Sequence, residues 1–373
     1  MLTREQFFHR AFAAAASSIS VLSEAQPRPR RTSPPYLKID AWTHAIPPSH
    51  VDRLKQVTQL VQMPALKAVM AVTELFDMDA RFRTMDRSGS YAQVLTPIPG
   101  LHLAIAAADP QLATVLVGAA NDGLAGLVAK YPERFRGWVA LLPLHNLDAA
   151  LIELGRALGM GALGVQFETN IGGVPLDHPR FEPLIGRIAA ADRPIWIHPF
   201  RLPAVPDFAT EETSRYMISQ SLGWPYETAA ALSRLVFTGV FDRFPNLRII
   251  GHHGGGMIPH FSGRLGRYLE VWGPRIDTDL GGALPRLKKP LLDYFRMFYV
   301  DTALNGAPHA VECVLDFFGP DHVLFGTDHP FDPGAGEFIR DTIADIEALK
   351  LDSRLKQGIF GGNALRLLRL RRM

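Results

Sequence analysis

Short runs of β-branched and aromatic residues alternate with longer segments of helical periodicity along most of the chain. The short runs cover residues 37–44, 92–97, 136–141, 163–167, 194–198, 247–251, 297–302 and 323–328. Helical patterns between them include residues 149–158, 181–190, 228–241, 308–317 and 336–349. This alternation is typical of a parallel sheet whose strands are connected by helices, and it predicts eight strand–helix units.

The number of units and the turn after the first run favour a closed barrel. No glycine-rich phosphate-binding turn follows residues 37–44, as it would in an open dinucleotide-binding sheet. Barrels of about 250 residues and more form one domain, so a chain of 373 residues does not require a second one. We therefore expect an α/β fold, a (β/α)8 TIM barrel, in a single domain of residues 36–373.

Residues 1–35 have a different character from the rest of the chain. Arg4 and Arg10 precede a mildly apolar stretch, residues 11–22. The small residues Ser23 and Ala25 follow it, at the spacing that a signal peptidase recognises. Residues 26–35 are rich in proline and arginine. Two interpretations remain open: a signal peptide in residues 1–25 that exports the protein to the periplasm, or a flexible extension of a cytoplasmic protein.

The composition limits the kinds of molecule that the protein is expected to bind. The chain is 47% hydrophobic and 20% charged, with a formal net charge of +2, as in an ordinary globular protein. We expect no nucleic-acid partner, because basic residues are not clustered with aromatic ones outside the termini. We expect no membrane partner either, because no stretch reaches the ~20 apolar residues needed to span a bilayer. With Cys313 as the one cysteine, a metal would be held by histidine and carboxylate.

Polar residues stand at or just past the ends of the predicted strands. The carboxyl ends of the strands form the face on which barrel enzymes carry out their chemistry. A single histidine or aspartate at such a place is an ordinary capping residue, but a set of them indicates a site. The set consists of His44, Gln166, His198, His252, His253, Asp301 and Asp328.

Three of these residues form a candidate metal site. His44, His198 and Asp328 end the first, fifth and eighth runs, and two imidazoles with one carboxylate can hold zinc and leave positions for water or substrate. His253 precedes three glycines, where the backbone can approach a ligand closely, and is placed to act as a general base or acid. Strand alternation does not decide whether His252 or His253 faces inward.

Several segments, taken in order, resemble one known family. They are residues 39–44 (IDAWTH), 164–166 (GVQ), 194–199 (PIWIHP), 253–256 (HGGG), 299–302 (YVDT), 326–328 (GTD) and 360–364 (FGGNA). The chain from Leu37 to Leu370 is similar to the amidohydrolase-related branch typified by aminocarboxymuconate-semialdehyde decarboxylase. The resemblance implies a barrel of the metal-dependent hydrolase type and one divalent metal, with zinc favoured and manganese as the alternative.

The resemblance also implies roles for single residues. His44 and His198 bind the metal, Asp328 completes its site, and His253 acts as the catalytic base together with Asp328. In relatives, an arginine eleven places after that base reaches into a neighbouring subunit and holds a substrate carboxylate. Here that residue is Arg264, which implies a homodimer or a larger homo-oligomer and a small carboxylate substrate.

Substrate contacts are expected from Gln166, from Trp224 in the segment 223–225 (GWP), and from Trp42. Trp42 departs from the family pattern, which has His-x-His at the end of the first strand. Indole cannot bind a metal, and positions 42 and 44 share one face of a strand, so Trp42 is expected to fill the space beside the metal. Three protein ligands then remain, which is enough for a catalytic zinc.

These observations predict a metal-dependent, non-oxidative decarboxylase of an aromatic or conjugated carboxylic acid. Two alternatives stay open. The same ligands suit a metal-dependent hydrolase of a lactone, ester or amide, in which Asp328 takes a proton from water. Trp42 also leaves room for a metal-free barrel that binds a ligand without turnover.

Overall fold

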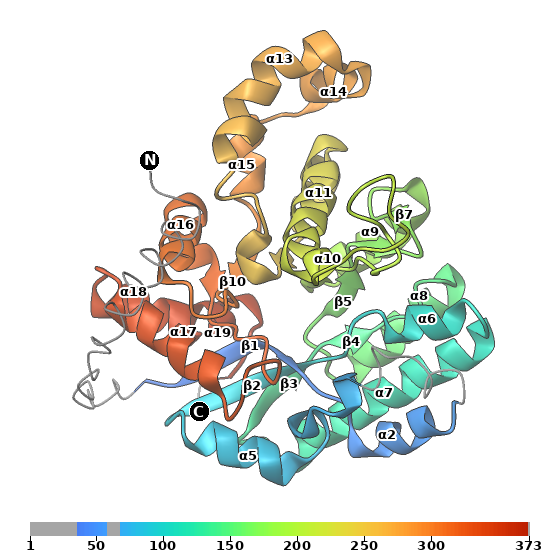
Figure 1. Ribbon diagram of the computed structural model, residues 1–373, viewed down its shortest axis with the longest axis vertical. Helices are drawn as coiled ribbons and strands as arrows, with labels where there is room; N and C mark the ends of the chain where they lie inside the picture. The colour runs from blue at the N-terminus through green and yellow to red at the C-terminus, as the bar shows by residue number, and fades with distance from the viewer. Residues whose placement is uncertain (1–35, 58–67, 372–373) are drawn as a thin grey trace, which may run out of the picture. The chain divides into compact units, whose positions relative to one another are not determined.

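The computed structural model describes residues 36–57 and 68–371 (Figure 1). The leader expected in residues 1–35 lies outside this range. Each of the eight predicted runs contains a strand, and the third is interrupted at Val139. The barrel strands are β1 (Lys38–His44), β2 (Tyr91–Thr96), β3 (Phe135–Trp138), β4 (Ala140–Leu141), β5 (Val165–Glu168), β8 (Ile195–His198), β9 (Ile249–Gly251), β10 (Tyr299–Asp301) and β11 (Val323–Leu324).

All pairings between these strands are parallel, and backbone hydrogen bonds join them into a ring. One sheet has the order β1-β2-β3 and the other β11-β10-β9-β8-β5-β4. At one junction the amide of Val139 donates to the carbonyl of Leu95 (2.9 Å). At the other, the amide of Ala41 donates to Phe325 (2.8 Å), and Thr43 bridges to His329. The predicted (β/α)8 barrel is confirmed.

Helices connect the strands and form the outer layer. The prediction of one helix over residues 228–241 is wrong at its end, because Gly239 adopts a left-handed conformation (φ +71°) that separates α11 from α12. The helices are α2 (Pro48–Lys55), α5 (Met78–Asp86), α6 (Leu101–Ala106), α7 (Pro110–Lys130), α8 (Leu147–Gly159), α9 (Glu182–Ala190), α10 (Ile218–Ser221), α11 (Gly223–Phe237), α12 (Val240–Arg243), α13 (Leu269–Ile276), α14 (Thr278–Ala283), α15 (Leu291–Phe295), α16 (Pro308–Phe318), α17 (Glu337–Ala348), α18 (Ser353–Gln357) and α19 (Asn363–Leu367).

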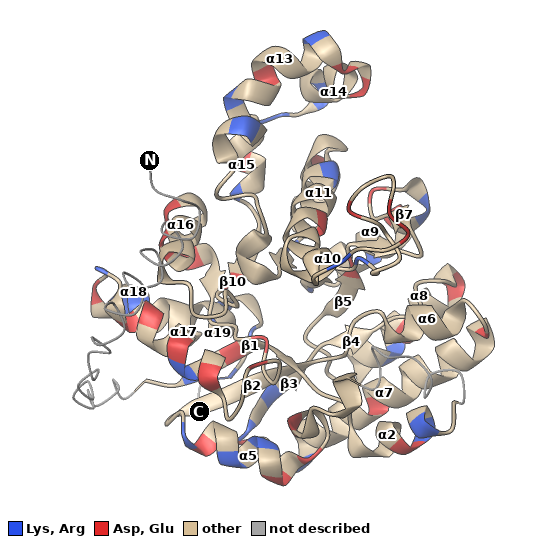
Figure 2. Ribbon diagram, viewed as in Figure 1, with Lys and Arg blue, Asp and Glu red and all other residues tan. Residues whose placement is uncertain are grey.

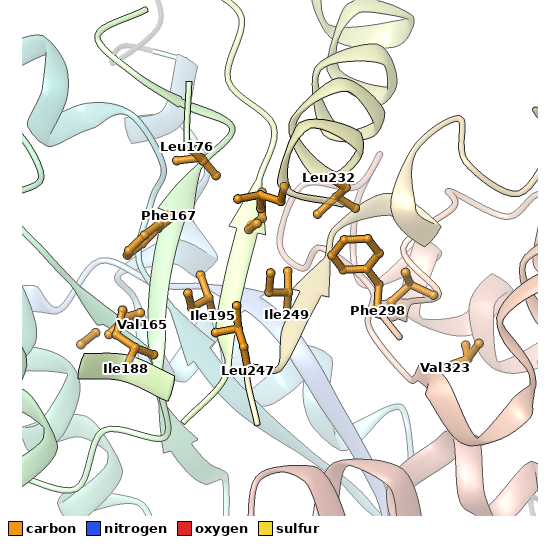
Figure 3. Close-up of a cluster of buried hydrophobic side chains, with 14 of the residues drawn as sticks. Val165, Phe167, Leu176, Ile188, Ile195, Leu232, Leu247, Ile249, Phe298 and Val323 are labelled. Carbon is orange, nitrogen blue, oxygen red and sulfur yellow. The ribbon is translucent and has the colours of Figure 1, made fainter. Parts of the chain in front are cut away.

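Alternation along the strands divides the core into two apolar layers. Ile195 and Ile249 point outward and pack with helix residues such as Ile188 of α9 and Leu232 of α11 (Figure 3). The residues that follow them in sequence, including Trp196, point into the barrel. This inner layer also contains Trp42, Val94, Ile250, Leu324, Ala364 and Leu367. Inward-facing positions at the carboxyl ends of the same strands carry the polar site.

Helix α7 corrects one expectation from the sequence. The helix is 21 residues long and contains an 18-residue window with a mean hydropathy of 1.5, so by length and composition it could span a membrane. Its buried side chains, which include Leu116 and Leu124, belong to the core clusters of the barrel. Asn121 of α7 also exchanges hydrogen bonds with the backbone of Leu141, both at 2.9 Å. These contacts make α7 part of the outer helical layer.

Helices α13 and α14 stand away from the strands (Figure 1). The segment from Arg264 to Arg286, called the arm below, begins with a π-helical turn over Arg264–Tyr268. Side chains of α13 are unusually exposed for apolar residues, with Trp272 at 48% and Ile276 at 74%. Basic and acidic residues are interspersed on α13, as they are on α5 (Figure 2). Such mixing does not resemble the basic face of a nucleic-acid-binding protein.

Candidate metal centre and active site

Four polar side chains meet where four barrel strands end. His44 ends β1, His198 ends β8, His252 follows β9 and Asp328 lies four residues past β11. One ligand atom from each lies within 4.8 Å of the others. The three imidazoles are buried, while the side chain of Asp328 is 13% exposed. The structure thus brings together His44, His198 and Asp328, as the metal-site prediction requires, and adds His252.

Hydrogen bonds fix the orientation of all three imidazoles. Nδ1 of His44 lies 2.8 Å from the carbonyl of Pro97, and Nδ1 of His198 lies 2.6 Å from that of Pro199. Nδ1 of His252 lies 2.5 Å from Oδ2 of Asp301. Carbonyl and ionised carboxylate oxygens only accept, so each Nδ1 carries a proton and each Nε2 is the nitrogen left to face a metal. This arrangement is typical of metal-binding histidines, and the four side chains fit one divalent metal ion.

Asp328 is held as a carboxylate by its neighbours. Its Oδ1 lies 3.2 Å from Nε2 of His44 and 3.3 Å from Nε2 of His252. Its Oδ2 lies 3.6 Å from Nε2 of His253. Burial alone would raise the pKa of Asp328, but hydrogen bonds with these three histidines lower it well below its ordinary value. Asp328 is therefore ionised and able to bind a cation.

The histidines differ in their electrostatics. Burial, together with the neighbouring His252 and His44, lowers the pKa of His198 far below its ordinary value, so His198 is neutral. Burial would also lower the pKa of His252, but Asp301 and Asp328 raise it to about 9. His198 thus offers a free lone pair at neutral pH, whereas His252 must lose a proton before it can bind a metal.

His253 lies at the edge of this cluster. Its side chain is 16% exposed, and its Nδ1 has no hydrogen-bond partner among the described residues. Its backbone is left-handed (φ +52°), which turns it away from the position that strand alternation would give it. Burial lowers its pKa. His253 can therefore exchange a proton with Asp328 or with a bound molecule.

The four remaining predicted site residues lie in different settings. Trp42 is fully buried and stacks on His252 with ring centroids 4.0 Å apart and planes 7° apart. Trp224, at the start of α11, lies edge-on to His198 at 5.4 Å. Gln166 is paired in register with Trp196, and neither polar atom of its side chain has a partner within residues 36–57 and 68–371. Arg264 is exposed at the base of the arm, where its guanidinium lies over Tyr268, 5.1 Å from the ring centroid.

One buried acid was missed by the sequence analysis. Glu168 ends β5 directly beside His198 and is fully buried. Its Oε1 accepts the amide of Gly100 (2.9 Å), and burial raises its pKa to about 7. The predicted strand stopped at residue 167. Extending the alternation by one position would have placed Glu168 on the inner face with Gln166.

Comparisons with known proteins support the fold described above. A family model described as amidohydrolase matches residues 39–370. The 2-amino-3-carboxymuconate-6-semialdehyde decarboxylase of Dictyostelium discoideum is 29% identical over 350 residues, covering 90% of this chain and 92% of the relative. The gamma-resorcylate decarboxylase of Rhodococcus jostii is 32% identical over 288 residues, covering 73% and 84%.

Solved structures agree with these sequence comparisons. A dihydroxybenzoic acid decarboxylase from Polaromonas, crystallised with manganese and the inhibitor 2-nitroresorcinol, superimposes with a TM-score of 0.73 at 27% identity. The superposition covers 91% of this chain and 98% of that one. This chain therefore shares its fold with a manganese-containing decarboxylase, and its own cluster of histidines and aspartate fits a divalent metal.

Proposed function

Because the chain belongs to the amidohydrolase family, we propose that it is a metal-dependent, non-oxidative decarboxylase of an aromatic or conjugated carboxylic acid. The observation that carries the proposal is the cluster of His44, His198, His252 and Asp328 at the barrel mouth. The full-length match to a decarboxylase from Dictyostelium discoideum supports it.

The reaction needs a proton donor and a site that holds the substrate carboxylate until CO2 leaves. A proton carried by His253, beside the carboxylate of Asp328, adds to the carbon that bears the substrate carboxylate. The bond from that carbon to the carboxylate then breaks, its electron pair restores the conjugated system, and CO2 leaves. His253 regains its proton from solvent. When bound, a divalent metal supplies Lewis-acid stabilisation of a substrate oxygen. Trp224, which lies edge-on to His198, and Gln166, whose buried amide has no partner among the described residues, are the residues expected to position a flat substrate.

The donor set favours zinc over manganese. Imidazole ligands suit zinc and other later transition metals, whereas manganese prefers carboxylate and water oxygens. The cluster offers up to three imidazoles and one carboxylate. The Polaromonas relative was crystallised with manganese, so zinc is this proposal's own assignment.

We further propose that the enzyme is a homodimer in which Arg264 serves the partner's site. Arg264 is exposed and, within the described part of the chain, makes no hydrogen bond or ion pair with the metal-site cluster, while the arm beside it presents Val271, Trp272 and Ile276 to solvent. An exposed apolar surface of this kind is typical of a protein–protein interface. A guanidinium delivered by a second copy matches a substrate carboxylate bidentately.

The proposal is tested by measuring CO2 release from carboxylated phenols and conjugated acids with the metal-loaded full chain. We expect CO2 from at least one such acid, and loss of that activity in His253→Ala and Asp328→Ala. The control variant is His309→Ala, an exposed position on α16. Hydrolysis of lactones or esters without any CO2 release would refute decarboxylation and favour the hydrolase.

A further inference from the structure

We propose that His252 is a fourth protein ligand of the metal, because Trp42 cannot bind a metal at the end of β1. The inference rests on the proposed metal centre, but it does not depend on the reaction being a decarboxylation. It assigns different roles to two neighbouring histidines: His252 is a metal ligand, and His253 carries a proton.

The position of His252 relative to Asp328 matches that of an expected ligand. Its Nε2 lies 3.3 Å from Oδ1 of Asp328, and Nε2 of His44 lies 3.2 Å from the same oxygen. Its ring centroid is 5.1 Å from that of His198, close to the 5.3 Å between the rings of His44 and His198. His44 and His252 therefore approach one carboxylate oxygen of Asp328 at similar distances, and His198 packs at similar spacing beside both rings.

The surroundings of His252 hold its ring in one orientation. Asp301 accepts from Nδ1 through Oδ2, and its other oxygen, Oδ1, accepts the amides of Gly254 (3.2 Å) and Ala303 (3.1 Å). Trp42 covers one face of the imidazole in a nearly parallel stack and is itself fully buried. A carboxylate on Nδ1 raises the basicity of the opposite nitrogen and fixes its direction, as in carboxylate–histidine–zinc triads.

His253 lacks these features. No carboxylate accepts from its Nδ1 among the described residues, its Nε2 is 3.6 Å from Asp328, and its side chain is partly exposed. A proton carrier needs access to solvent or substrate, and the side chain of His253 is 16% exposed. A ligand needs a fixed lone pair in a buried cluster, which His252 has. In this proposal Trp42 stands on β1 where the family pattern has a histidine. It also packs against His252, which serves as a ligand instead.

Two measurements on the full chain test the inference. X-ray absorption spectroscopy of the zinc-loaded wild type counts the imidazoles around the metal, and we expect three. Zinc affinity is then compared between His252→Ala and the matched control His253→Ala by competition with a chromophoric chelator. We expect His252→Ala to bind zinc at least about 100-fold more weakly, because loss of an outer partner alone costs about 10- to 100-fold. His253→Ala should keep the wild-type affinity.

Asp301→Asn supplies a conservative check on positioning. It should weaken zinc binding by about 10- to 100-fold while the imidazole count stays at three. Two imidazoles in the wild-type spectrum would overturn the inference even if His252→Ala failed to fold. Wild-type affinity in a folded His252→Ala would also overturn it. A wild type that takes up no metal would remove the metal centre itself, whereas a three-imidazole site without CO2 release would refute only the decarboxylase.

Discussion

Asp40 provides a quantitative test of how the two strands that carry His44 and Asp328 are held together. It lies on β1, is fully buried, and accepts hydrogen bonds from the hydroxyl of Tyr91 (2.6 Å) and the amide of Thr327 (3.1 Å). Burial raises its pKa from 3.8 to about 7, although these hydrogen bonds act in the opposite direction. Asp40 therefore ties β1 to the residue next to Asp328, and its burial makes the folded state most stable when the carboxyl is protonated.

The magnitude follows from the shift in pKa between the unfolded and folded states. Below about pH 4 the carboxyl is protonated in both states, and its contribution to the free energy of unfolding is fully present. As pH rises from about 4 to 7, the unfolded state loses the proton first, so this contribution falls until the folded state also ionises. A shift of about three units corresponds to about 4 kcal/mol, a large part of a typical free energy of unfolding.

The variant Asp40→Asn mimics the protonated acid, because an amide can still meet the hydroxyls of Tyr91 and Thr327. Urea denaturation of wild type and variant between pH 4 and 8 measures the difference in their free energies of unfolding. Groups other than Asp40 cancel in that difference. We expect the variant to gain about 4 kcal/mol relative to wild type over this range, with most of the change between pH 4 and 7. A difference that stays constant with pH would refute a raised pKa at Asp40.

Three further predictions follow from the packing and the arm. Trp42→Ala removes a fully buried indole and should lower the free energy of unfolding by about 3–5 kcal/mol in urea titrations, while a loss under 1 kcal/mol would contradict its tight packing. Trp272→Glu combined with Ile276→Glu should convert the proposed dimer to a monomer in light scattering without changing the circular dichroism spectrum; an unchanged dimer mass would exclude the arm as the interface. Arg264→Lys should raise KM for the carboxylate substrate about tenfold or more, because a bidentate contact is lost, whereas Arg267→Lys, on the same turn, should leave KM unchanged.

The barrel could be predicted from the sequence because its strands are buried on both faces. Runs such as residues 194–198 are almost continuously apolar, and the helices between them are long enough to show their period. The interruption at Val139 and the break at Gly239 were not predicted, because one residue in a different backbone conformation does not change a hydrophobic pattern. The arm was missed because α13 buries only a glycine and has no core-facing stripe.

The sequence predicted where the candidate site lies better than it predicted the roles of single residues within the site. Strand ends placed His44, His198 and Asp328 at one barrel face, and the structure brings them together. In the structure the alternation continues through His252, which faces inward like Ile250, and the left-handed backbone at His253 breaks the period of two only after that point. Whether Arg264 serves a neighbouring subunit depends on a second chain, about which the sequence pattern carries no direct information.

The most direct test of the account is to measure metal occupancy and CO2 release on the same samples. Chelator-treated full-length protein is titrated with zinc, and in parallel with manganese, while CO2 from an active carboxylated phenol is recorded. The account predicts that activity rises in proportion to bound metal and saturates at about one ion per chain, and that His198→Ala and Asp328→Ala show neither stoichiometric metal nor CO2 release. Full activity in metal-free protein would contradict a metal-dependent decarboxylase.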